Sequence, residues 1–183
     1  MLPIGPLMIE HRLIERMIKV MKHELLQAEG QQKIDPRFIE TATNFIRAYA
    51  DRCHHGKEED ILFRELKKKK IAPEHQAVME ELIEEHKKGR QLTARLVEAN
   101  SRYMNGDKGA LHEIFESMST LIGFYPKHIE KEDKSFFLPI MGQFSKEEKD
   151  AMLAEGYRFD AGLLHEEHQK IVEEAEHGLP PKS

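Results

Sequence analysis

One short pattern occurs twice in this chain and constrains its fold more than any other feature. The pattern H-x-x-K-E stands at residues 54–58 and again at 128–132, 74 positions later. A Glu-His pair precedes each copy by a similar distance, with His11 43 residues before the first copy and His86 42 residues before the second. The chain is therefore built from two similar halves, each with one His followed by a His and a Glu four positions apart.

The sequence around these residues has the periodicity of α-helices. Apolar residues recur at steps of three and four, and no segment shows sustained alternation of apolar and polar residues. Asp35-Pro36 and Pro73 are typical helix starts, and the 105–109 cluster is typical of a turn. We expect helices at 7–29, with Gly30 ending the first, and at 36–69, 73–104, 110–141, 145–154 and 159–176.

Four long helices joined by short loops predict an all-α fold, an up-down-up-down four-helix bundle. We expect residues 1–142 to form this bundle and residues 143–183 to form a C-terminal helical extension that packs on the same domain. A capping box at residues 145–148 marks the start of that extension.

This topology brings the repeated histidines to one height in the bundle. His11 and His86 each lie 18 residues before the end of their predicted helix, and His54 and His128 each lie 18 residues after the start of theirs. In an antiparallel bundle these four helix ends lie together, and every helix rises about 1.5 Å per residue. The four imidazoles should therefore meet at one level, together with the glutamates that follow His54 and His128.

Six side chains in this arrangement are suited to bind two metal ions. A His and a Glu four residues apart share a helix face, so two helices offer a nitrogen and a carboxylate each, and the other two offer a nitrogen each. Carboxylates can bridge two ions, and mixed nitrogen and oxygen donors with open positions suit redox iron better than structural zinc. Any one of these histidines alone would more simply be a hydrogen-bonded core residue. The candidate ligands are His11, His54, Glu58, His86, His128 and Glu132.

The remaining histidines and the single cysteine have weaker cases. His55 is about 100° round the helix from its neighbour and is expected to point outward or to lie behind the ligands. His165 and His168 are expected to form hydrogen bonds near the centre rather than to bind metal directly. Cys53 is expected to pack in the core. Four histidines without a repeat partner are expected on the surface: His23, His75, His112 and His177.

These segments resemble the hemerythrin-like, or HHE cation-binding, family. The resemblance rests on residues 8–11, 54–63, 84–90 and 128–133, and it covers about residues 7–142. It implies a four-helix bundle around two iron ions joined by an oxo or hydroxo bridge, with zinc or manganese as other occupants to consider. By the match, the residues that carry over as ligands are His11, His54, Glu58, His86 and His128.

The sequence departs from the oxygen carriers of this family in one place and leaves a choice in another. Those carriers have a second His four residues after the first on the third helix, where this chain has Arg90, which we expect to form a salt bridge. They use an Asp five residues after the last His, and Asp133 stands at that offset, whereas the internal repeat favours Glu132. Four His and two Glu would be similar to di-iron proteins implicated in iron–sulfur cluster repair and nitric-oxide stress. Glu59 and Asp133 are candidates to orient ligating imidazoles.

The favoured function is that of a non-haem di-iron protein that binds or processes a small diatomic ligand, with O₂, NO and peroxide as the candidates, in sensing or in a stress response. Two alternatives stay open: an enzyme that repairs iron–sulfur clusters or detoxifies NO, and a metal-dependent regulatory or structural bundle that signals through residues 145–177. Enzyme and sensor, protein partner and oligomeric state are all left open by the sequence.

The bulk composition argues against several other partners. The formal net charge is −5 and Lys67–Lys70 is a short basic run, so nucleic-acid binding is not expected. No apolar run approaches the ~18 residues that span a membrane. One cysteine and the lack of a secretory signal favour a cytoplasmic protein.

Overall fold

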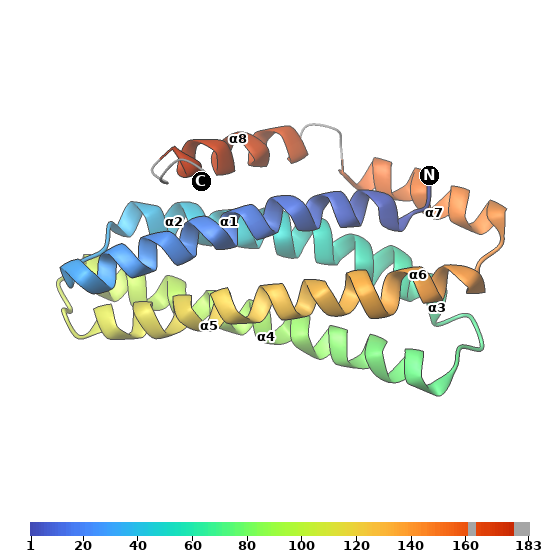
Figure 1. Cartoon of the computed structure of the whole chain (residues 1–183), viewed down its shortest axis with the longest axis horizontal. Coiled ribbons are helices and arrows are strands. Elements are labelled where there is room, and N and C mark those ends of the chain that lie inside the picture. Colours follow the sequence, from blue (N-terminus) through green and yellow to red (C-terminus); the bar gives the residue numbers. More distant parts are fainter. Residues whose placement is uncertain (161–163, 178–183) are drawn as a thin grey trace.

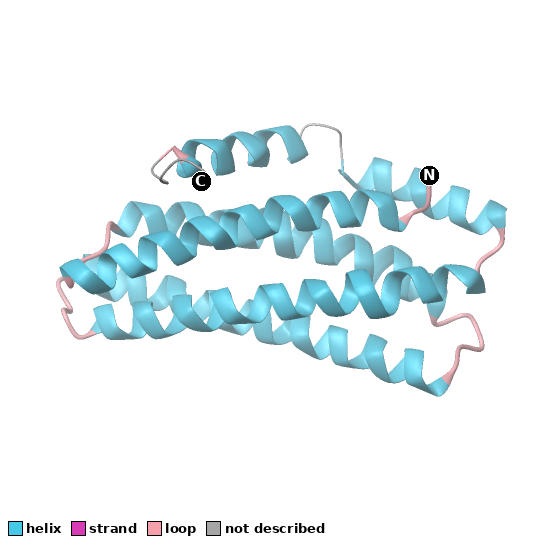
Figure 2. Cartoon of the chain, in the orientation of Figure 1, coloured by secondary structure: helices cyan, strands magenta, loops and turns pink. Residues whose placement is uncertain are grey.

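The chain folds as an all-α bundle, as the sequence predicts. The computed structural model describes the backbone of residues 1–160 and 164–177, and the side chains of these residues except 164–166. Four long helical columns run side by side in alternating directions, and two further helices lie on the outside of the bundle (Figure 1). Within the described part of the chain every regular element is a helix (Figure 2).

The four columns correspond to the four long helices expected from the sequence. Column one is α1 (Ile4–Gln31) and column three is α4 (Pro73–Met104). The other two columns change their winding along their length. Column two contains α2 (Pro36–Phe45), η1 (Ile46–His55), η2 (Glu58–Phe63) and α3 (Arg64–Leu66), and column four contains α5 (Ala110–Lys131), η3 (Glu132–Phe136), α6 (Phe137–Ile140) and η4 (Met141–Gln143). The outer helices are α7 (Lys146–Asp160) and α8 (Leu164–Glu176).

The winding of columns two and four is π-helical over part of each copy of the H-x-x-K-E pattern. In the first copy His54, His55 and Glu58 lie in η1 and η2, and in the second copy only Glu132 lies in η3, whereas His128–Lys131 belong to α5. In η1, η2 and η3 the backbone bonds from i to i+5, so each turn contains more residues than an α-helical turn. Adjacent side chains are then separated by less than the usual 100°, and both members of a neighbouring pair can face the interior. Three such pairs lie in these segments: His54-His55, Glu58-Glu59 and Glu132-Asp133.

The helix ends follow the sequence signals in two places and differ in two others. The Asp35 carboxylate accepts a hydrogen bond from the Arg37 backbone N–H at 3.0 Å, and the capping box at Ser145 forms as predicted. Gly30 does not end α1; the cap is Gln32, which has a φ of 51° and donates its N–H to the Ala28 carbonyl.

Helix α7 is longer than expected. We predicted a break between residues 154 and 159, but the helix continues to Asp160, and the last helix, α8, begins at Leu164 rather than at 159. Gly156 lies inside this helix, and a glycine within a helix costs only about 1 kcal/mol of stability relative to alanine. Contacts with the bundle offset that cost, because Met152 is buried and Asp160 lies 3.3 Å from the Lys57 ammonium.

Two clusters of buried apolar side chains fill the bundle, one on each side of the repeated His and Glu residues. The larger cluster includes Met17, Phe45, Leu96 and Leu121, and the smaller includes Leu7, Phe63 and Phe136. Because the polar residues lie between these two apolar regions, they are shielded from solvent along the bundle axis.

The two outer helices attach to the bundle through buried side chains, such as Met152 of α7 and Val172 of α8, and through ion pairs. The Arg16 guanidinium donates two hydrogen bonds to Glu176 of α8, at 3.0 and 2.7 Å, and Arg64 makes a similar pair with Glu155 of α7. Helix α8 lies along α1 and α2 (Figure 1). Among the described residues, no helix has the length and apolar character needed to cross a membrane.

Candidate metal centre

The structure brings all six predicted ligands together at one height. They come from α1, η1, η2, α4, α5 and η3, and each is at most 2% exposed. Ligand atoms of one subset lie within 4.8 Å of one another, and this subset is His11, His54, Glu58 and Glu132. The six side chains therefore lie at one level of the bundle, as the spacing of the residues along the helices predicts.

Each glutamate lies between imidazoles from two different columns. Glu58 Oε1 lies 3.4 Å from His54 Nε2, and Glu58 Oε2 lies 3.3 Å from His86 Nε2. Glu132 Oε2 lies 3.1 Å from His11 Nε2, and Glu132 Oε1 lies 3.3 Å from His128 Nε2. In each carboxylate one oxygen thus faces an imidazole of one column and the other oxygen faces an imidazole of a second column. This is the arrangement of a bridging ligand.

Eight polar atoms at this centre are buried and have no hydrogen-bond partner of acceptable geometry among the described residues. They are the Nε2 atoms of His11, His54, His86 and His128 and both carboxylate oxygens of Glu58 and Glu132. Buried polar atoms in proteins are nearly always satisfied, and an unpaired buried carboxylate is especially costly. A convergent set of unpaired nitrogens and oxygens fits metal cations, which bind these atom types.

The other ring nitrogen of each of these four imidazoles, Nδ1, is hydrogen-bonded to a carboxylate. The Nδ1 of His11 donates to Asp133 at 2.8 Å, and that of His54 donates to Glu10 at 2.9 Å. In the second half, the Nδ1 of His86 bonds Glu59 at 2.7 Å and that of His128 bonds Glu85 at 2.8 Å. Such hydrogen bonds place a proton on Nδ1. The Nε2 atom then faces the centre and can give its lone pair to a metal ion.

A cation neutralises each of the four outer carboxylates. Arg90 lies 2.7 Å from Glu59, and Arg12 pairs with Asp133. The other two cations are the lysines of the repeated pattern: Lys57 pairs with Glu10, and Lys131 lies 2.6 Å from Glu85. The lysine of H-x-x-K-E therefore pairs with the carboxylate that accepts a hydrogen bond from the histidine at the start of the pattern.

The sequence analysis found two of these outer carboxylates and missed two. Glu59 and Asp133 were expected to orient imidazoles, and they do so, each on a histidine from the other half of the chain. Glu10 and Glu85 were not predicted. The signal was present, because each immediately precedes the first histidine of its half.

The surrounding carboxylates shift the protonation of the central imidazoles. Burial lowers the pKa of His11, but the carboxylates of Asp133 and Glu132 outweigh it and raise the pKa to about 10. Burial also lowers the pKa of His86, and the glutamates around it raise the value to about 11. A metal ion that binds these nitrogens must therefore displace protons from them.

His55 is buried, so of its two expected positions the outward one is wrong and the one behind the ligands fits. It is 2% exposed, and its ring stacks on that of His86 with 4.0 Å between the ring centres. The expectation of an outward side chain assumed 100° per residue, which the π-helical winding of η1 does not keep. Burial and the neighbouring imidazoles lower the pKa of His55 well below its usual value.

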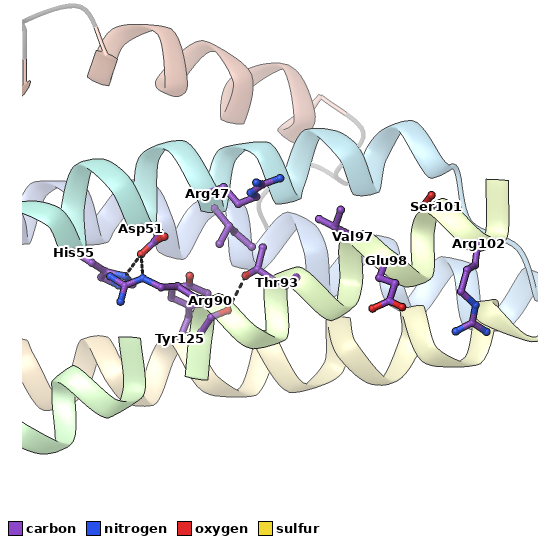
Figure 3. Close-up of a pocket in the computed structure, with 13 residues that line it drawn as sticks. Arg47, Asp51, His55, Arg90, Thr93, Val97, Glu98, Ser101, Arg102 and Tyr125 are labelled. Carbon is purple, nitrogen blue, oxygen red and sulfur yellow. Dashed lines mark hydrogen bonds and ion pairs between the residues drawn. The ribbon is translucent and has the colours of Figure 1, made fainter. Parts of the chain in front are cut away.

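A pocket of about 590 Å³ reaches His55 from the surface between η1, α4 and α5. His55, Asp51 and Arg90 lie together at one end of this pocket, with Tyr125 beside them (Figure 3). Arg90, which occupies the position of the carriers' extra His, is held in the predicted salt bridge and also lies 2.6 Å from Asp51.

The remaining candidates lie outside the centre. His168 is buried against the rings of Phe45 and Tyr49, with ring centres 5.9 and 5.2 Å away. The side chain of His165 is outside the described residues. Cys53 is buried as expected, and its thiol donates to Asp160 at 3.1 Å. The histidines expected on the surface are exposed or partly exposed: His23, His75, His112 and His177.

Comparison with protein families gives one match. Residues 2–140 match the family described as the Hemerythrin HHE cation binding domain. The comparison with curated proteins gave no match, and neither did the comparison with solved structures. The matched range includes all six predicted ligands and the four outer carboxylates.

The raised pKa values predict how the stability of the metal-free protein depends on pH. His11 and His86 bind protons more tightly in the folded chain than in the unfolded chain, where their pKa is about 6.5. Their contribution is complete below pH 6.5 and is lost as the pH rises toward 10. We expect the urea midpoint of the metal-free protein to fall between pH 7 and pH 8.5. A midpoint that stays constant or rises, with no difference from the His11→Gln/His86→Gln double variant, would contradict this.

The outer carboxylates predict a matched pair of variants on α4. Glu85→Gln removes the charge that holds His128, whereas Glu84→Gln changes the adjacent residue, whose side chain is 70% exposed. Loss of such an outer partner typically lowers metal affinity 10–100-fold. We expect that loss for Glu85→Gln and none for Glu84→Gln, measured by competition with a chelator. Equal affinities for the two variants would show that Glu85 does not support the centre.

Proposed function

The chain belongs to the hemerythrin HHE cation-binding domain family, and on this basis we propose that it is a non-haem di-iron protein that binds or processes a small ligand such as O₂, NO or peroxide. The family implies a metal cation, and clusters of His and Glu side chains are available to hold it. The observation that carries the proposal is the set of eight buried nitrogen and oxygen atoms, between the two apolar clusters, that have no hydrogen bond within the described residues.

The grouping of these atoms supports two ions rather than one. His11 and His54 lie on one side, with ring centres 4.5 Å apart, and His86 and His128 lie on the other, with ring centres 5.0 Å apart. Glu58 and Glu132 each present one oxygen to a histidine of each side. Each ion would therefore have two imidazoles of its own and share both carboxylates with its neighbour.

The donor types support iron. Imidazole and carboxylate without thiolate suit iron, whereas thiolate-rich sets suit structural zinc, and the only cysteine bonds Asp160 instead. Two bound iron ions would supply one-electron redox chemistry and open positions for a small ligand. Zinc or manganese in the same donors would bind without supplying the same reactivity toward O₂.

The protein's own part is to orient the donors and to exclude water. The four carboxylates on Nδ1 fix the imidazole orientations, and the ring of Phe137 stacks on His11 at 5.6 Å while that of Phe124 stacks on His128 at 5.5 Å. These rings pack on two of the candidate ligands, and all six candidates are at most 2% exposed. A small ligand held there would be kept away from bulk water, which suppresses side reactions of a reactive species.

The proposal is tested by loading the protein with Fe²⁺ under anaerobic conditions, then measuring metal content and visible absorption before and after exposure to O₂. We expect about two irons per chain and new near-ultraviolet and visible bands on oxidation, with NO and peroxide tested next on the same sample. Glu58→Ala, which removes one candidate bridge, should bind less than two. Failure of the wild-type chain to take up iron would overturn the proposal and favour another metal or a structural bundle.

A second candidate function, metal-dependent regulation, is favoured by one contact of the C-terminal extension. Asp160, the last residue of α7, lies 3.3 Å from the Lys57 ammonium and accepts a hydrogen bond from Cys53. Lys57 pairs with Glu10, and Glu10 accepts a hydrogen bond from His54. The extension is thus connected to the candidate centre through a short chain of charged groups.

This connection predicts that iron binding changes the dynamics of α7. Ordering of His54 by metal should order Glu10, Lys57 and then Asp160, so iron should slow hydrogen exchange in α7. Asp160→Asn should weaken that effect, whereas Asp150→Asn, an exposed change on the same helix, should leave it intact. Exchange in α7 that is the same with and without iron would rule out this route of regulation.

A further inference from the structure

A small pocket beneath α7 has one wall that the family match does not include. The match ends at residue 140, and α7 begins at Lys146. The pocket lies between α7, η2 and the start of α1, near the N-terminus of the chain (Figure 1). Leu7, Leu62, Met152 and Gly156 are among the residues that line this α7 pocket. Its volume is about 30 Å³, whereas a single water needs roughly 10–15 Å³. The α7 pocket therefore has room for a molecule of only a few atoms.

The α7 pocket is open because one residue on its wall has no side chain. Gly156 lies four residues after Met152 and four before Asp160, so the three share a face of α7. That face is directed at the bundle, since Met152 is buried and Asp160 contacts Lys57 and Cys53. A Cβ added at Gly156 would meet no neighbouring group within 4 Å among the described residues. A larger side chain at this position would therefore occupy the pocket.

The opposite wall of the α7 pocket lies one helical turn from the candidate ligands. Leu7 is four residues before His11 on α1, and Leu62 is four residues after Glu58 on η2. Residues four apart lie on the same face of a helix, so each leucine faces the bundle interior beside a candidate ligand. Both leucines are buried and both line the pocket. They therefore stand between the α7 pocket and the centre.

Apolar side chains continue from these leucines to the candidate ligands themselves. The smaller apolar cluster contains both leucines together with Phe63 and Phe137. The ring of Phe137 stacks on that of His11, with 5.6 Å between the ring centres, and the ring of Phe63 stacks on that of His86 at 6.0 Å. The α7 pocket is thus connected to the centre through packed apolar groups alone.

The larger pocket, of about 590 Å³, has a different inner end. There Arg90 lies 2.6 Å from Asp51 and 2.7 Å from Glu59, and the buried ring of His55 lies behind them. A ligand that passed this way would have to break charge-assisted hydrogen bonds. Aliphatic side chains change rotamer without such a loss, and uncharged diatomic molecules are more soluble in apolar surroundings than in water. These differences favour the α7 pocket as the path for O₂ or NO.

We propose that the α7 pocket is the entry site for an uncharged diatomic ligand, O₂ or NO, which reaches the metal pair through the apolar cluster around Leu7 and Leu62. The inference rests on the proposed di-iron function and adds where the ligand enters. It also gives α7 a role, because a helix outside the family-matched range forms the outer wall of the path. Contacts that hold α7 on the bundle then control how fast the ligand arrives.

The first test fills the α7 pocket and measures NO binding to the ferrous protein by stopped-flow absorption. Gly156→Leu should fold, since replacing a glycine inside a helix favours the helical state. We expect the variant to lower the association and dissociation rate constants by the same factor, about 10-fold, which corresponds to ~1.4 kcal/mol of added barrier. The equilibrium affinity should stay unchanged, because a blocked path alters the barrier and neither end state.

Two matched variants separate the path from other effects of the substitution. Gly123→Leu adds the same side chain at an exposed position of α5 with open space beside it, and Ala94→Leu fills part of the larger pocket. Neither should change the NO rate constants. Unchanged rates in Gly156→Leu, or rates slowed by Ala94→Leu instead, would overturn the inference. A weaker NO affinity in Gly156→Leu with an unchanged association rate would also contradict it.

A second test needs no metal. Xenon binds in apolar cavities, so a crystal of the metal-free protein under xenon pressure should show xenon in the α7 pocket, and Gly156→Leu should remove it. Absence of xenon there in the wild-type chain would overturn the inference. Failure of the chain to take up iron would contradict the proposed function instead, and the xenon measurement would then decide by itself whether the pocket admits a small apolar molecule.

Discussion

The constraint on which the rest of the structure depends is the burial of two carboxylates and four imidazoles at the middle of a helical bundle. Glu58 and Glu132 are fully buried and their oxygens lack hydrogen bonds within the described structure. Placing such groups away from water is costly unless opposite charge compensates it. The large shifts in the pKa of His11 and His86 express this requirement, since the carboxylates draw protons onto imidazoles that burial alone would keep neutral.

Charge alternates outward from this centre in three steps. Glutamates lie at the middle, imidazoles surround them, outer carboxylates bond the Nδ1 atoms, and a lysine or arginine pairs with each outer carboxylate. The H-x-x-K-E pattern supplies a residue to three of these layers: the histidine, the outer lysine and the central glutamate. This explains why Lys57 recurs as Lys131. Each layer fixes the position of the one inside it, so that the donor atoms are held in place before any cation binds.

The sequence predicted the bundle and the six central residues because both depend on local periodicity and on the internal repeat. It left His55 open between an outward position and one behind the ligands, since π-helical winding in η1 changes the angle between neighbours, and no composition signal marks such a turn. Glu10 and Glu85 were missed although each directly precedes a candidate ligand. Like Glu59 and Asp133, each bonds a histidine on another column, and spacing along one helix does not show which carboxylates pair across columns. Helix α7 is longer than predicted because its contacts with the bundle, including that of Asp160 with Lys57, outweigh the low helix propensity of Gly156.

The central claim is that these six side chains hold a pair of iron ions between two apolar layers. The most direct measurement is a crystal structure of the iron-loaded protein with anomalous diffraction recorded on both sides of the iron absorption edge. The account predicts two anomalous peaks within bonding distance of His11, His54, His86, His128, Glu58 and Glu132. Peaks bound elsewhere on the chain, or no peak among these residues after iron loading, would contradict it.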